Sequence, residues 1–193
     1  MSKINILLLS LLILRLVVHG QTHQDIITTA RKQFHEINAD TSLKKITLDG
    51  EEFLDHVPDG GGELTGFLKG DSIVKIPEWI GLSYGNRIRA YYYKHDKLFF
   101  IFEKFESFIE KNGELDYGRV KTSFEARYYF NNEKLIEQKI SGKKPLEDNS
   151  TDMSTELQQG AKDKFELMLK KQRRQHSADI EYRILLMRDK LYK

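Results

Sequence analysis

The chain has 193 residues, of which 39% are hydrophobic and 31% charged, and this length and composition suit one folded domain, or one domain with an appendage. It contains no cysteine, which excludes disulfide scaffolds, thiol catalysis and cysteine-ligated metal sites. The 31 basic and 29 acidic residues nearly balance, so the composition gives no reason to expect a nucleic-acid partner.

The first twenty residues are typical of a secretory signal peptide. Lys3 supplies the positive charge, an apolar run covers residues 4–18, and Gly20 precedes the expected cut before Gln21. Because Arg15 interrupts this run, and crossing a bilayer takes about 20 apolar residues, an uncleaved anchor is the less favoured alternative. We therefore expect an exported protein, periplasmic or secreted, with no transmembrane segment after signal removal.

The mature chain is predicted to begin with an amphipathic helix over residues 24–38. Its apolar positions recur at helical spacing, and Thr22 or Asp25 can cap its N-terminus. These positions are Ile27, Ala30, Phe34 and Ile37. From residue 43 to 49 the period changes to two, which predicts a strand, and the glycines at 60–62 predict a loop.

Residues 63–140 are predicted to form successive antiparallel hairpins, a meander of about six strands. Polar turns separate the strands at residues 69–72, 94–97 and 131–134. Residues 121–130 alternate between an apolar and a polar face, which is typical of a strand with one face buried. Residues 98–102 are apolar on both faces, so we expect this strand to be central and covered on its second side by a helix.

Aromatic residues are concentrated in this region, and two interpretations remain open. The favoured one is a sheet core, because strands favour aromatic residues. The alternative is a surface that binds a protein, a glycan or an apolar ligand, carried by Tyr91, Tyr93 and Tyr129, which lie on the more polar faces of their strands.

Residues 141–159 are polar and are predicted to be a linker, with Asn149 in a glycosylation sequon. Residues 160–193 are predicted to be a helical tail. Its later part carries an apolar stripe at Ile180, Ile184, Met187 and Leu191, and residues 170–177 are expected to be solvated or bent. We expect the last turns to pack on the body or on another copy.

The predicted tail is basic, whereas the rest of the mature chain is acidic. Residues 161–193 hold 10 basic and 5 acidic residues, and residues 21–160 hold 19 and 24. A charged tail is usually a solvated helix face; the alternatives are contact with an acidic surface, with the body, or with another copy.

Residues 81–85 match the G-x-S-x-G pattern of a serine hydrolase, with Ser83 as nucleophile. That chemistry needs a strand before the serine and a helix after it. The residues after Ser83 alternate like a strand, so we interpret the segment as a hairpin loop.

The sequence shows no clear motif for metal binding, phosphate binding or glycoside hydrolysis. The histidines form no metal-binding pair, no phosphate loop is present, and no cofactor is expected. A carboxylate pair for glycoside hydrolysis could come from Glu78, Glu103 and Glu125, but the sequence does not say how their strands pair, so no two of them can be placed about 5 Å apart. We expect no metal site and no catalysis.

Three stretches resemble uncharacterised exported proteins of Bacteroidota-type bacteria. They are residues 61–67, residues 75–83, and residues 91–93 with 97–104. The resemblance implies a periplasmic or secreted location and transfers no activity and no site residue.

Together these patterns predict an α+β protein with an N-terminal helix, an antiparallel meander and a C-terminal helical tail. We expect a non-enzymatic binding or envelope-associated protein. The alternatives are a carrier that holds an apolar ligand or lipid in a half barrel under a helix, and a hydrolase acting through Ser83.

Overall fold

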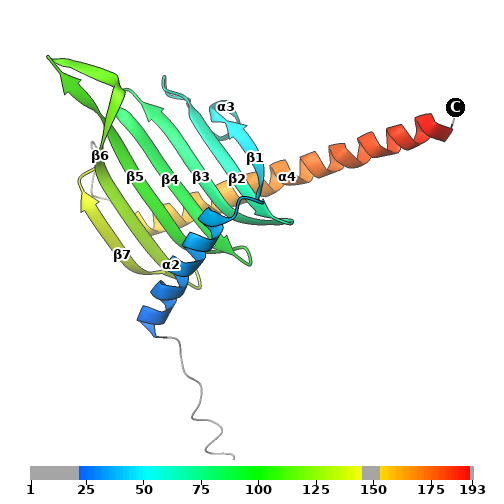
Figure 1. The fold of residues 1–193 in the computed structure, drawn as a ribbon, viewed down its shortest axis with the longest axis horizontal. Helices are drawn as coiled ribbons and strands as arrows, with labels where there is room; N and C mark the ends of the chain where they lie inside the picture. Colours follow the sequence, from blue (N-terminus) through cyan, green and yellow to red (C-terminus); the bar gives the residue numbers. More distant parts are fainter. Residues whose placement is uncertain (1–21, 145–152, 192–193) are drawn as a thin grey trace, which may run out of the picture.

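The structure, a computed structural model, describes residues 22–144 and 153–191. The predicted signal peptide and Asn149 lie outside this part of the chain. The protein is α+β, with an N-terminal helix, a seven-stranded antiparallel sheet and a long C-terminal helix (Figure 1). This is the predicted fold class.

Each strand pairs antiparallel with the next one in the chain, so the sheet is a simple meander in the order β1 to β7. The predicted hairpins correspond to β2–β7, and β1 joins them as a seventh strand. The elements are α2 (His23–Ala39), β1 (Lys44–Asp49), α3 (Gly50–Phe53), β2 (Gly62–Lys69), β3 (Ser72–Leu82), β4 (Gly85–Lys94), β5 (Lys97–Lys111), β6 (Glu114–Asn131), β7 (Lys134–Gly142) and α4 (Met153–Leu191).

Helix α2 begins at a capping box. The Asp25 backbone N–H donates to Thr22 Oγ1 over 3.2 Å, and the Thr22 backbone N–H donates to Asp25 Oδ2 over 3.1 Å. Two of the otherwise unsatisfied N–H groups at the helix start are thereby paired. This confirms the predicted helix and assigns the cap to Thr22.

The three predicted turns are also confirmed, and two of them have the same backbone. His95 and Asp96 both have positive φ, at 48° and 61°, and Asn132 and Glu133 repeat this at 48° and 63°. Two consecutive left-handed residues are the type I′ geometry that matches the twist of hairpin strands. The similar sequences around the β4–β5 and β6–β7 turns therefore form the same kind of turn.

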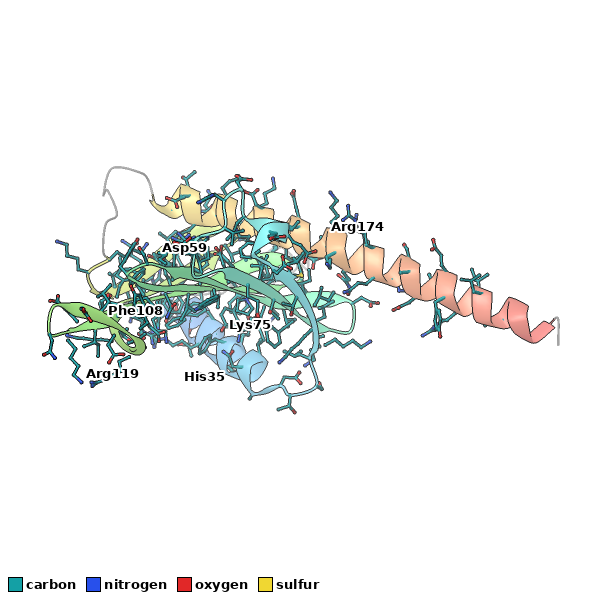
Figure 2. The ribbon with its side chains drawn as sticks, turned by 90° about the horizontal axis from the view of Figure 1, so that it is seen from above. His35, Asp59, Lys75, Phe108, Arg119 and Arg174 are labelled. Carbon is teal, nitrogen blue, oxygen red and sulfur yellow. The ribbon has the colours of Figure 1, made fainter. Side chains whose placement is uncertain are left out.

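The sheet is covered by α2 on one face and by α4 on the other (Figure 2). Residues of α2 pack against Tyr92, Phe100 and Tyr129. The opposite face holds the larger core, which includes Ile76, Tyr91, Ile101 and Tyr128 under α4. Strand β5 contributes to both cores, as its apolar residues on both faces predict.

Helix α4 begins earlier than the sequence predicts. The predicted linker over residues 141–159 is wrong for 141–142, which end β7, and for 153–159, which form the first turns of α4. Leu157 and Ala161, each 1% exposed, extend the apolar side of the helix toward its N-terminus at a spacing of four residues. Their polar neighbours hide this pattern.

Candidate functional site: the anchored and projecting halves of the C-terminal helix

The first half of α4 is seated directly on the sheet. Met168 is fully buried over β2, and a Cβ atom added to Gly66 would lie 2.6 Å from the Met168 Cγ and Sδ atoms. Tyr93 Oη donates a hydrogen bond of 2.8 Å to the Ala161 carbonyl. Glycine at position 66 thus allows the helix to approach the strand more closely than any side chain would.

A buried row of charges crosses the sheet beneath this half of the helix. Glu78 on β3 pairs in register with Arg89 on β4, and Arg89 pairs with Glu103 on β5. These side chains are only 3%, 8% and 1% exposed. Arg89 Nε donates to Glu103 Oε1 over 2.8 Å. Buried charges must be paired in this way to offset their loss of hydration.

Two lysines and two tyrosines complete this charge cluster. Lys164 Nζ on α4 lies 3.5 Å from Glu78 Oε1, and Lys144 Nζ lies 3.0 Å from Glu103 Oε1. Tyr91 Oη donates to Glu78 Oε2 over 3.2 Å. Tyr128 Oη donates to Glu103 Oε2 over 3.3 Å. The Lys164 contact ties the helix to the sheet by charge as well as by apolar packing.

The environment fixes the charge states of the cluster. Burial opposes ionisation of Glu103, but the positive charges of Arg89 and Lys144 outweigh it and hold the pKa of Glu103 below its ordinary value. Burial raises the pKa of Tyr91, and the negative charge of Glu78 adds to the shift. Near neutral pH, Glu103 is therefore an anion and Tyr91 a neutral hydrogen-bond donor, which suits an anchor of fixed charges.

Of the three carboxylates that sequence spacing could not pair, the structure brings Glu78 and Glu103 onto the same face. Both are closed off from solvent, with Arg89 between them. Glu125 is one step along β6 from the inward-facing Phe124 and Ala126, and forms an ion pair with Arg127. Arg89 is not among the residues predicted from the sequence, although a charged residue at an inward position of a strand is the signal that could have found it.

The candidate binding tyrosines are all in the core. Tyr91, Tyr93 and Tyr129 are 1%, 3% and 2% exposed. The first two lie under α4, whereas Tyr129 lies under α2, where its Oη accepts a hydrogen bond of 3.3 Å from Arg31 Nε. They are not brought together and do not form an exposed surface, so the structure supports the sheet-core interpretation of these residues.

Ser83 lies in the turn between β3 and β4, and a strand follows it, as the hairpin-loop interpretation expects. His95 lies in the next turn along the chain, between β4 and β5. Consecutive turns of a meander lie at opposite ends of the sheet. The structure therefore separates the serine from the first histidine that follows it by the length of a strand.

The second half of α4 extends beyond the sheet (Figure 1). A helix of 39 residues is about 58 Å long at about 1.5 Å per residue. The seven strands that it crosses span only about 29 Å at about 4.8 Å between neighbours. Near the edge of the sheet, Lys171 Nζ lies 2.5 Å from Glu52 Oε1, and Gln172 Nε2 donates to the Asp71 carbonyl over 2.9 Å.

We call residues 173–191 the arm. Figure 2 shows Arg174 where the helix passes the edge of the sheet. Every arm side chain that the structure describes is exposed. Of the two expected packing partners of the last turns, the body is therefore wrong for these residues, and another copy stays a prediction. The large apolar side chains among them are Ile180, Tyr182, Ile184, Leu185 and Met187, at 45%, 63%, 60%, 47% and 65% exposure.

No group of three or more histidines and carboxylates within residues 22–144 and 153–191 is placed to hold a metal ion. In the same part of the chain, no helix combines the length and the apolar character needed to cross a membrane.

Comparison with protein-family models, with curated proteins and with solved structures finds no match to this chain. The candidate site therefore rests on the geometry of the anchor and the arm.

Proposed function

We propose that the protein is a non-enzymatic exported binding or envelope-associated protein that engages its partner through the arm. The observation that carries this proposal is the apolar exposure of the arm. Among the described residues, five of the ten exposed large apolar side chains lie on it, although it is a short segment of one helix. Concentrated apolar exposure of this kind typically marks an interaction surface.

Helix energetics support the same conclusion. Most helices in proteins gain their stability from tertiary packing of an apolar face. The described arm side chains are all exposed, although several from residues 173–179 line a surface cavity together with β1 and the β2–β3 turn. A partner that covers the apolar side chains would supply the missing stabilisation.

The first half of α4, residues 153–172, holds the arm in a defined position relative to the sheet. Apolar packing at Met168, the Lys164–Glu78 pair and the Lys171–Glu52 pair hold the preceding turns of the same helix. The arm therefore leaves the body in a direction set by the sheet. A helix fixed at one end has less conformational freedom to lose when it binds than a flexible tail would have.

The alternatives receive less support. A carrier needs a hollow beneath a helix, whereas α4 lies in direct contact with β2 at Gly66. A surface cavity of about 610 Å³ at the C-terminal end of α2 has a mixed lining, with charged residues such as Lys32 and Asp40 beside apolar ones such as Ile37 and Phe99. A hydrolase would need Ser83 next to a histidine. The predicted signal peptide supports the exported location.

The test is photo-crosslinking from the arm in the cells that make the protein. The photoreactive amino acid p-benzoylphenylalanine replaces Ile184 or Met187, and a matched control places it at Lys32, an exposed helical position on α2. We expect irradiation to give adducts from both arm positions and none from Lys32. Absence of arm adducts, or equal adducts from Lys32, contradicts the proposal.

A further inference from the structure

The apolar side chains of the arm have an arrangement that identifies a class of partner, and this inference rests on the proposed function. We infer that the partner is a second copy of the chain, with the two arms pairing antiparallel along the stripe formed by Ile180, Ile184 and Met187.

The stripe is narrow and straight. At about 100° per residue, Ile184 and Met187 lie within about 40° of Ile180 around the helix. Their spacings of four and three residues are those of core positions in a coiled coil. By sequence, Leu191 continues the stripe and Ser177 and Arg173 end it. The apolar stripe, which would form the seam between two paired arms, therefore covers residues 180–191 and stops before the helix reaches the body.

A narrow stripe favours another helix over a membrane surface. A helix that lies in a membrane interface presents one broad apolar face opposite a polar one. Here Tyr182 and Leu185 lie about 200° and about 140° from Ile180 around the helix, and Glu181 adds an acidic residue between the two sides. The apolar residues are thus split between opposite sides of the arm, and only one side has the spacing of a seam.

The charges that flank the seam favour the antiparallel arrangement. With Ile184 at a core position a and Ile180 and Met187 at d, Glu181 and Arg188 both occupy the flanking position e. Antiparallel pairing places Glu181 of each arm near Arg188 of the other, although it also brings Arg183 near Lys190. Parallel pairing instead places Arg183 against Arg188 and leaves Glu181 beside His176 rather than Arg188.

The geometry of the body permits this pairing. In the antiparallel register Ile184 lies level with Met187 of the second copy, so the body contacts at Gln172 on the two copies are 27 residues apart along the axis. That separation is about 40 Å at about 1.5 Å per residue. The two sheets therefore do not collide, and only the arms meet.

Disulfide trapping tests the arrangement, because the natural chain has no cysteine and engineered thiols react without background. Two full-length variants, Ile184→Cys and Met187→Cys, are oxidised separately and as a mixture in which one carries an affinity tag. Disulfides need Cα atoms within about 7 Å. We expect the mixture to form a tagged–untagged dimer and each variant alone to form little. Efficient dimerisation of Ile184→Cys alone indicates parallel pairing and overturns the inference.

Sedimentation equilibrium of cysteine-free protein tests the same pairing without crosslinking. We expect a concentration-dependent dimer, a dissociation constant raised at least about tenfold by Ile184→Ser, and a change of less than about twofold for Leu185→Ser on the opposite side of the arm. Because the arm is not packed on the body, both variants should keep the fold, which circular dichroism checks.

Two results overturn self-pairing but leave the arm as a binding surface. One is a chain that stays monomeric at all concentrations while photo-crosslinking from Ile184 gives an adduct whose mass is not twice that of the chain. The other is a monomer that sediments with vesicles of phosphatidylglycerol and phosphatidylcholine and loses this binding in Ile184→Ser. A monomer that forms no arm adduct overturns both the inference and the proposed function.

Discussion

Gly66 of β2 and Met168 of α4 lie in such close contact that the strand and the helix leave no room for a Cβ atom between them. A Cβ at position 66 would approach the Met168 Sδ atom to 2.6 Å. This contact lies in the turn of α4 just before the arm begins, so it sets how closely the anchored half of the helix sits on the sheet.

Alanine at Gly66 should therefore destabilise the protein. Met168 or the whole helix has to shift, and we expect the free energy of unfolding to fall by about 1–3 kcal/mol. Urea denaturation followed by circular dichroism measures it. Gly118→Ala is the control, because a Cβ there meets only Asp116 Oδ1, at 3.4 Å. Equal denaturation midpoints for the two variants contradict the close contact.

A larger loss of stability is expected when the buried charge cluster is disrupted. Glu103→Gln removes the negative charge that Arg89 and Lys144 share in a buried site. Breaking a buried ion pair from one side typically costs about 3–5 kcal/mol, and we expect a loss in that range. Glu125→Gln, which loses a partly exposed pair with Arg127, should cost less than about 1 kcal/mol. A loss at Glu103 no greater than at Glu125 shows that the cluster is not an anchor.

The same carboxylate gives the stability a pH dependence of known sign. The pKa of Glu103 is lower in the folded protein than its ordinary value of 4.5, because the charges of Arg89 and Lys144 outweigh burial. The resulting stabilisation is complete above the unfolded-state pKa and is lost as the pH falls through the folded-state pKa. Urea midpoints measured from pH 7 to pH 3 should fall in acid more steeply for the natural chain than for Glu103→Gln. Parallel curves contradict this assignment.

Glu52 and Lys171 mark the boundary between the anchored and projecting halves of α4. Glu52→Gln should loosen this boundary, so amide hydrogens of residues 170–175 should exchange faster while those of residues 157–168 remain protected. Glu51→Gln removes the same charge from the adjacent exposed position and serves as the control. Mass spectrometry of peptides from α4 measures the exchange. Identical exchange in both variants shows that the ion pair does not hold the helix.

The sequence predicted the fold where local chemistry decides the structure. Turns such as His95–Asp96 and Asn132–Glu133 need residues that tolerate positive φ between strands of alternating pattern, and both conditions are visible in the sequence. The Asn112–Gly113 turn has the same kind of backbone, with φ of 56° and 85°. It is missing from the predicted turns because polar residues flank it and hide the alternation.

The candidate site depends on contacts between residues that are far apart in the sequence, and no local sequence pattern reveals such contacts. The pairing of Glu78, Arg89 and Glu103 follows from strand register, which sets which inward-facing positions become neighbours. The burial of Tyr129 depends on where α2 crosses the sheet. Likewise, the apolar stripe of the tail was visible in sequence, but its exposure follows from α4 being longer than the sheet is wide.

Amide exchange of the arm across protein concentration is the most direct measurement of the central claim, that the arm is a contact surface. The peptide covering residues 175–187 should be weakly protected in dilute protein and increasingly protected as concentration rises, while peptides from residues 157–168 stay protected throughout. Ile184→Ser should remove the concentration dependence and Leu185→Ser should retain it. Rapid arm exchange at every concentration, identical in the natural chain and in both variants, would contradict pairing between arms, and rapid exchange that also persists in the cells' envelope fraction would contradict any contact through the arm.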